Sequence, residues 1–125
     1  MIHALSVGAT LPAANIERAK KFYADKLGLQ PDESLPTGEV IYMLNGFPFT
    51  IYQSQFAGTA KNTAMGIETD DLERDMGDLR SRGVVFEEYD MGDIKTVNGV
   101  VNDPAGGKAA WFKDSEGNII GLFQR

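Results

Sequence analysis

The sequence predicts an α+β fold built from two βαβββ modules that follow one another along the chain. Segments with alternating apolar residues, typical of strands, are interrupted by two segments with helical spacing of apolar residues. Three pairs of segments match in the same order: Ile16-Glu17-Arg18 with Leu72-Glu73-Arg74, Gly28-Leu29 with Gly83-Val84, and Thr50-Ile51-Tyr52-Gln53 with Gly121-Leu122-Phe123-Gln124. An internal repeat indicates the architecture, here one domain over 1–125 with modules at about 1–55 and 63–125.

The first module opens with a predicted strand over residues 5–10, which Pro12 is expected to end. Its apolar residues Leu5, Val7 and Ala9 are expected to pack on a helix. That helix has Asn15 as its N-cap, and Gly28 stands where a left-handed residue stops a helix.

The second module repeats this plan. Residues 63–69 alternate as a strand, and Asp70 or Asp71 caps a second helix, which Gly83 ends. Val84–Tyr89 alternates again and predicts another strand.

Each module is expected to end in a hairpin, and the length of the turn sets the register of its strands. The turns are Asn45-Gly46 in the first module and Asp114-Ser115-Glu116-Gly117 in the second. The predicted hairpin strands are Glu39–Leu44, Pro48–Gln53, Ala109–Lys113 and Asn118–Gln124.

Composition excludes several kinds of site and partner. Without cysteine the chain has no disulfide, thiolate nucleophile or cysteine-based metal site, and its one histidine, His3, excludes a two-histidine iron centre within one chain. A net charge of −6 and a pI of about 4.7 argue against nucleic acid and anionic membranes as partners. No apolar run predicts a membrane span and no basic segment predicts a signal peptide, so a cytoplasmic protein is expected.

Two motifs and the modular plan resemble the vicinal oxygen chelate superfamily of glyoxalase I, fosfomycin resistance proteins, extradiol dioxygenases and bleomycin resistance proteins. The motifs are NIERAKKFYADKLGL over 15–29 and AAWFKDSEGNIIGLFQ over 109–124. Small bacterial members of the glyoxalase or bleomycin-resistance type share similar stretches. The resemblance implies that the two modules close one cup-shaped mixed sheet with the helices outside. It also implies a homodimer, with modules paired within one chain or swapped between two, and the linker Gln55–Asn62 permits either.

Metal-using members of the superfamily carry one ligand on the first strand and one on the last strand of each module. By the resemblance, these positions are Gly8, Thr50, Ala64 and Gly121. Glycine and alanine have no donor atom, and a threonine hydroxyl is a poor sole ligand. The sequence therefore predicts a degenerate site with no metal and no cofactor. His3 comes too early in the chain to replace a ligand and is expected to be exposed, to lie at a strand edge, or to make a dimer contact.

Strand alternation assigns the residues that would line the cup. Small residues form its floor, and apolar and aromatic side chains form its wall, although each aromatic could also be plain core. Trp111, the single tryptophan, is the best candidate for ligand stacking, and Glu68 is a polar anchor or a base. The segment Met91–Lys108 is either a lid or a connecting loop. The predicted ligand-binding residues are Ile41, Met43, Thr50, Tyr52, Glu68, Trp111 and Phe123.

These observations favour a metal-free small-molecule-binding protein of the glyoxalase or bleomycin-resistance type, which holds a bulky apolar or aromatic ligand. Two alternatives stay open. One is a lyase, isomerase or dioxygenase with an atypical metal site or none, so whether the chain is an enzyme is undecided. The other is a structural or interaction protein whose own side chains fill the cup. The sequence does not identify the ligand or the dimer mode.

Overall fold

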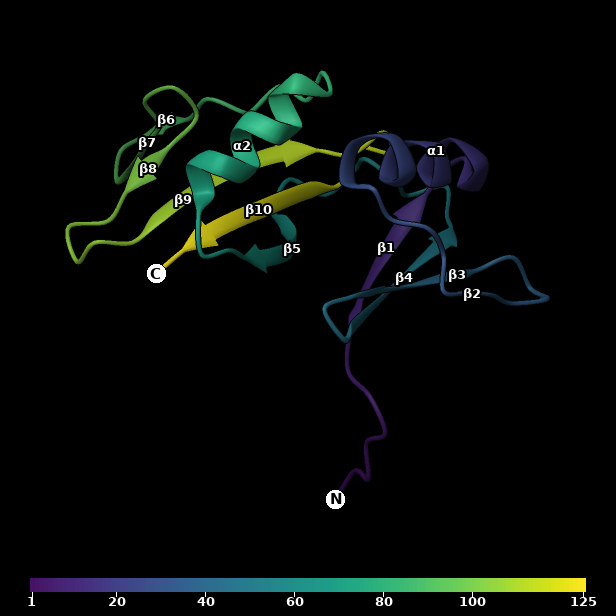
Figure 1. Cartoon of the computed structure of the whole chain (residues 1–125). Coiled ribbons are helices and arrows are strands. Elements are labelled where there is room, and N and C mark those ends of the chain that lie inside the picture. The colour runs from purple at the N-terminus through teal and green to yellow at the C-terminus, as the bar shows by residue number, and fades with distance from the viewer. The chain divides into compact units, whose positions relative to one another are not determined.

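The computed structural model describes residues 1–125, which form two compact units (Figure 1). Unit 1 comprises residues 1–60 and 115–118, and unit 2 comprises residues 61–114 and 119–125. Each unit holds one helix and one four-stranded mixed sheet, which confirms the predicted α+β class. Neither helix combines the length and the apolar character that crossing a membrane requires.

Unit 1 follows the predicted βαβββ order. Its strands are arranged β1-β4-β3-β2, with β1 parallel to β4 and the other pairs antiparallel. The Asn45-Gly46 turn joins β3 to β4, and both residues have positive φ, as this tight turn requires. The elements are β1 (Ala9–Ala13), α1 (Ile16–Leu27), β2 (Glu33–Ser34), β3 (Val40–Leu44) and β4 (Phe47–Gln53).

The predicted ends of α1 are confirmed. The Asn15 side chain accepts a hydrogen bond from the backbone N–H of Arg18 at 3.0 Å. Gly28 adopts a left-handed conformation with φ 67°, which a residue without Cβ does at little cost.

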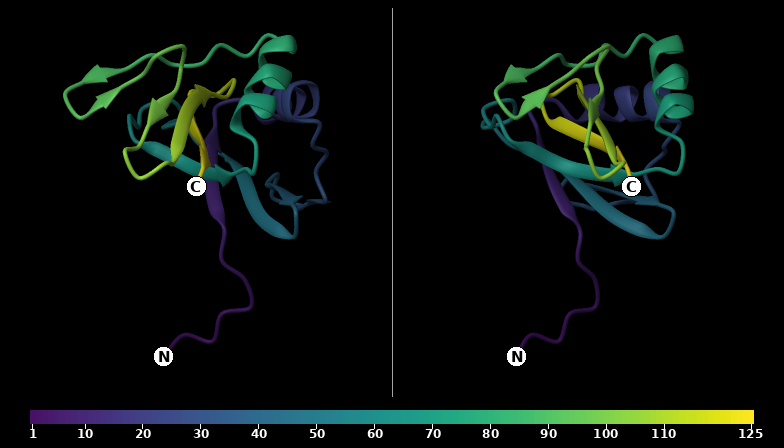
Figure 2. Two further views of the ribbon diagram at one scale, coloured as in Figure 1. Left: turned by 60° about the vertical axis from the view of Figure 1, so that its left-hand side comes forward. Right: turned by 90° about the vertical axis from the view of Figure 1, so that its left-hand side faces the viewer.

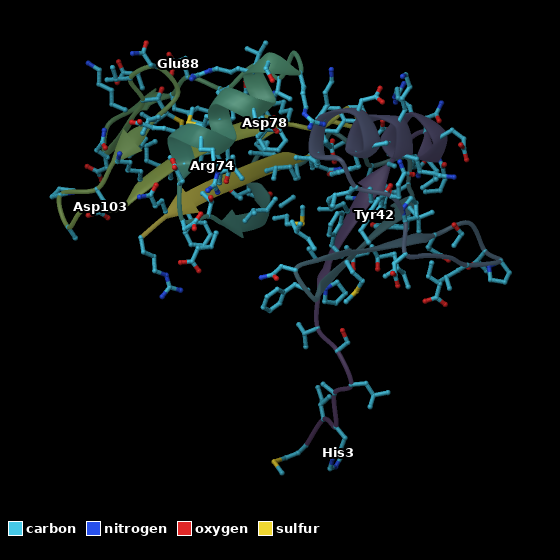
Figure 3. The ribbon with its side chains drawn as sticks, in the orientation of Figure 1. His3, Tyr42, Arg74, Asp78, Glu88 and Asp103 are labelled. Atoms are coloured by element: carbon cyan, nitrogen blue, oxygen red, sulfur yellow. The ribbon has the colours of Figure 1, made fainter.

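The core of unit 1 lies between α1 and its sheet and is aromatic. Tyr42 lies in this core (Figure 3). Its ring stacks on Phe49 with centroids 4.9 Å apart, and the Tyr23 ring of α1 lies 5.5 Å from that of Tyr42. All three side chains are buried. The Tyr42 hydroxyl has no hydrogen-bond partner, and burial raises the pKa of Tyr42 to about 12.

The first strand lies further along the chain than predicted. Residues 1–8 extend away from the sheet of unit 1 without pairing, so Leu5 and Val7 are exposed instead of packing on the helix (Figure 2). Pairing with β4 begins only where Ala9 lies opposite Phe49, although β4 itself starts at Phe47. Pro12 does not end β1 but lies within it, since an edge strand tolerates a missing N–H.

The turn 115–118 is bound to the start of α1. The buried Glu116 carboxylate accepts hydrogen bonds from the backbone N–H of Asn15 at 3.0 Å and from both Nε and Nη2 of Arg18, at 2.8 and 3.0 Å. The Asn118 side chain donates to the Pro12 carbonyl at 2.9 Å. These bonds to Glu116, above all those from Arg18, lower its pKa to about 2 despite the opposing effect of burial.

Unit 2 repeats the topology of unit 1, with strands in the order β5-β10-β9-β8 and β5 parallel to β10. The Asp71 side chain caps α2 by accepting from Arg74 N–H at 3.0 Å. A separate hairpin of β6 and β7 precedes β8. The elements are β5 (Thr63–Glu68), α2 (Leu72–Ser81), β6 (Asp90–Met91), β7 (Ile94–Lys95), β8 (Val101–Asn102), β9 (Lys108–Lys113) and β10 (Ile119–Gln124).

One strand prediction for unit 2 is wrong. Val84–Tyr89 forms no strand but makes a single bridge, from Phe86 to Phe112. The alternation in this segment reflects burial of Val84 and Phe86 on one side, not a ladder of backbone pairs. The segment 91–108, predicted as a lid or a connecting loop, contains β7, β8, the end of β6 and the start of β9.

Candidate functional site

The predicted site residues of unit 1 lie on the sheet face opposite α1. Ile41 pairs with Thr50, as the turn length predicted, and Met43 pairs with Pro48. Their neighbours along the strands point the other way and are buried under α1, whereas Met43 is 42% exposed. Tyr52 lies on the same face as Thr50, two residues further along β4. The four predicted residues of this unit therefore share one face.

The predicted residues of unit 2 occupy the corresponding face of the second sheet. Trp111 on β9 pairs with Gly121 on β10, again as predicted, and Phe123 pairs with Glu68 on β5. The alternate residues Ala110 and Phe112 are buried on the side of α2. The three residues Glu68, Trp111 and Phe123 therefore share the open face of their own sheet.

The Trp111 indole is held in one position by contacts on two sides. Its Nε1–H donates to the Thr63 hydroxyl at 3.2 Å. A Cβ at Gly121 would lie 3.2 Å from Nε1 and 3.3 Å from Cδ1, so the indole rests on the bare backbone of that glycine. On another side, the Tyr89 ring meets the indole edge to face, with centroids 5.6 Å apart and planes at 71°.

Glu68 is not isolated on this face. Its carboxylate forms an ion pair with the Arg125 guanidinium at 2.8 Å, and its side chain is 46% exposed. A partly exposed, paired carboxylate has the properties of a polar anchor.

The residues at the expected metal positions do not fit a metal ion. Gly8, Ala64 and Gly121 offer no side-chain donor, which leaves the hydroxyl of Thr50. At Gly8 the backbone leaves no room for a side chain, because a Cβ would lie 2.4 Å from the Pro48 carbonyl oxygen. Over Gly121 the space is occupied by Trp111.

No other part of the chain supplies a metal-binding cluster. No three His, Asp or Glu side chains are grouped so that they could hold an ion. His3 is exposed, one of the two situations expected for it, and lies in the N-terminal segment before the first strand begins at Ala9 (Figure 3). The donors present do not provide the several ligands that a divalent ion needs to replace its water.

Sequence reasoning missed a hollow of about 670 Å³ on unit 2. The polar groups in its wall bind one another: Arg80 Nη2 donates to the Asn98 carbonyl at 2.8 Å, and Gly99 N–H donates to the Glu88 carboxylate at 2.6 Å. The Arg80 guanidinium also lies 5.2 Å from the Phe86 ring centroid. Because Arg80 and Glu88 already form hydrogen bonds with backbone groups of the wall, this hollow is a weaker candidate for ligand binding than the open sheet faces. Its lining is Arg80, Gly83, Val84, Val85, Phe86, Glu88, Asn98 and Gly99.

Sequence reasoning also missed Tyr89. It lies at the end of the segment predicted as a strand, and its contact with Trp111 depends on how that segment folds back. No local pattern in the sequence indicates such a contact.

Comparison with solved structures identifies the fold. The chain is similar to a member of the glyoxalase/bleomycin resistance protein/dioxygenase superfamily from Sphaerobacter thermophilus, with TM-score 0.73, 21% identity and 100% of each chain covered. It is similar to TnmS3, an antibiotic binding protein from a Streptomyces species, with TM-score 0.68, 25% identity and coverage of 99% of this chain and 98% of that one. A fosfomycin resistance protein from Listeria monocytogenes gives TM-score 0.72 at 16% identity, over 100% of this chain and 95% of that one.

No family model and no curated protein matches the sequence. The structural likeness nevertheless extends over essentially the whole chain. The chain has the fold of the glyoxalase/bleomycin resistance protein/dioxygenase superfamily, which confirms the resemblance in the sequence.

Proposed function

We propose that this chain is a metal-free small-molecule-binding protein that holds a bulky apolar or aromatic ligand against the open faces of its sheets. The observation that carries the proposal is the Trp111 indole resting on Gly121. At the position where metal-using relatives are expected to have a ligand, this chain has aromatic surface instead. The residues proposed to contact the ligand are Ile41, Met43, Thr50, Tyr52, Glu68, Trp111 and Phe123.

The chemistry of these side chains supports binding rather than bond making. Ile41, Met43 and Phe123 offer apolar contact, and Trp111 offers a large flat surface. Thr50 and Glu68 are the polar groups available to orient a ligand. The likeness to TnmS3, an antibiotic binding protein, supports the same role.

Binding can be measured through Trp111, because it is the only tryptophan. Titration with a panel of planar aromatic and bulky aliphatic compounds is expected to give saturable quenching of its fluorescence with at least one compound. The variant Trp111→Leu, followed by calorimetry, should bind that compound at least about tenfold more weakly. A matched control, Phe56→Leu, removes an exposed aromatic ring outside the proposed site and should leave binding unchanged. Absence of saturable binding across the whole panel would disprove the proposal.

The metal-free part of the proposal has its own test. Protein purified without chelator is expected to contain no stoichiometric divalent ion by elemental analysis. A tightly held ion at one per chain would instead favour the lyase, isomerase or dioxygenase alternative. That alternative also predicts turnover of hemithioacetals or catechols only after metal is added.

The proposal extends to a homodimer in the bacterial cytoplasm. The homodimer and the bacterial origin come from the resemblance to the superfamily, whereas the cytoplasmic location is the expectation drawn from the sequence. Analytical ultracentrifugation at several concentrations is expected to give twice the chain mass of 13.6 kDa. A chain that sediments as a monomer throughout would remove the dimer from the proposal and leave the binding role to be tested separately.

A further inference from the structure

Tyr89 adds a second aromatic surface to the face that carries Trp111. The two rings stand edge to face at 71°, so they form a corner rather than a stack. A planar ligand that lies against the indole would therefore point its own edge towards the Tyr89 ring.

The Tyr89 side chain can be changed without breaking the bonds that hold its backbone. The Tyr89 N–H donates to the Thr96 hydroxyl at 2.7 Å, and the Thr96 N–H donates to the Tyr89 carbonyl at 2.8 Å. Thr96 is buried, so these bonds fix the base of the β6–β7 hairpin through main-chain atoms of Tyr89. The aromatic ring is thus available as a recognition surface.

The acidic residues near Tyr89 in the sequence are mostly balanced in the structure. Lys113 pairs with Glu87 at 3.3 Å, and Asp90 lies opposite Lys95 in the β6–β7 hairpin. The Glu88 carboxylate accepts from the Gly99 N–H in the wall of the hollow. The aromatic rings themselves remain as the groups that favour positive charge, because ring faces attract cations.

We propose that Tyr89 is a specificity-determining residue that makes the Trp111 face prefer a planar aromatic cation. The inference rests on the proposed binding function and adds the charge of the ligand to it. The indole supplies the flat surface, Tyr89 supplies a second ring beside it, and the faces of the two rings favour positive charge over an uncharged ring of the same shape.

Two probes of matched shape test the charge preference: the 10-methylacridinium cation, and acridine at pH 8, where it is neutral. Binding is followed by the polarisation of probe fluorescence and by quenching of Trp111. The cation is expected to bind the full chain about tenfold more tightly than acridine. Tyr89→Leu is expected to weaken cation binding about tenfold, and acridine binding by less. Tyr89→Phe keeps a ring and should retain most of the affinity, and Phe56→Leu should match the unaltered chain.

The outcomes separate this inference from the function on which it rests. Equal affinity for the two probes, or cation affinity unchanged in Tyr89→Leu, overturns the role of Tyr89 and leaves the binding function standing. Equal weakening in Tyr89→Leu and Tyr89→Phe also overturns it, because the aromatic ring would then not be what matters. Failure of both probes to bind, together with failure of the whole compound panel, overturns both proposals.

Discussion

Glu116 offers the sharpest test of how this chain is held together. It lies in the turn 115–118, 101 residues after Asn15 and 98 after Arg18, yet its carboxylate accepts hydrogen bonds from both of them. Its side chain is fully buried, while that of Arg18 is 54% exposed. Glu116→Gln keeps the shape and one acceptor oxygen but removes the charge, so it isolates the electrostatic part of the contact.

The size of the effect follows from the pKa of Glu116. The folded protein holds this pKa at about 2, against an ordinary value of 4.5. One pKa unit corresponds to about 1.4 kcal/mol, so the charged form is stabilised by roughly 3 kcal/mol on folding. Because the pKa is lowered, this contribution is complete above pH 4.5 and is lost as the pH falls from 4.5 towards 2. Glu116→Gln is therefore expected to lower the free energy of unfolding at pH 7 by about 2–3 kcal/mol.

Urea unfolding of the unaltered chain and Glu116→Gln, measured from pH 7 to pH 3, checks both the size and the pH dependence. The difference between the two proteins should shrink as the pH falls below 4.5. Glu17→Gln is a matched control, because Glu17 is 82% exposed and pairs with Lys20 at 3.5 Å. It should change the free energy of unfolding by less than about 0.5 kcal/mol at any pH. A Glu116→Gln difference that stays constant down to pH 3 would refute the electrostatic explanation.

Three other substitutions test separate contacts. Tyr42→Phe removes a buried hydroxyl without a partner and should raise the free energy of unfolding by about 1 kcal/mol in urea titrations; a loss of stability would show that the hydroxyl is bonded. Gly121→Ala puts a Cβ 3.2 Å from Nε1 of the Trp111 indole, so we expect a shift of the tryptophan emission maximum and a free energy of unfolding lower by about 1–2 kcal/mol. An unchanged emission spectrum would contradict the contact. Arg80→Ala removes the hydrogen bond to the Asn98 carbonyl and the contact with the Phe86 ring, and it should lower stability by about 1–2 kcal/mol in thermal unfolding. Arg82→Ala, at an exposed arginine, should lower it clearly less, and equal losses would count against the Arg80 contacts.

The elements that local chemistry defines could be predicted from the sequence. The Asn15 cap and the left-handed Gly28 set the bounds of α1, and both signals act within one helical turn. The Asn45-Gly46 turn sets the β3–β4 register for a similar reason, since a two-residue connection leaves one favoured pairing. Long-range pairing then follows from the repeat, which predicted the same plan for both units.

The two wrong strand predictions share a physical cause. Alternation of apolar residues indicates which side of a segment is buried. A strand also needs an adjacent segment whose backbone N–H and C=O groups are free to pair with it. Leu5 and Val7 alternate, but backbone pairing with β4 begins only at Ala9, so both residues stay outside the sheet and are exposed. Phe86 alternates with exposed neighbours and finds one partner residue, Phe112, instead of a ladder.

In the candidate site, too, the backbone pairing could be predicted from the sequence, whereas the placement of a side chain could not. That Trp111 opposes Gly121 could be predicted, because the hairpin turn fixes the register and a missing donor is visible in the sequence. The position of the indole above Gly121 could not be predicted, because it depends on the Trp111 side-chain rotamer and on the Thr63 hydroxyl from another strand. The absence of a side chain at Gly121 and the position of the Trp111 indole are thus linked. A larger side chain at 121 would have to displace the indole, so a long donor side chain and the indole cannot both occupy this space.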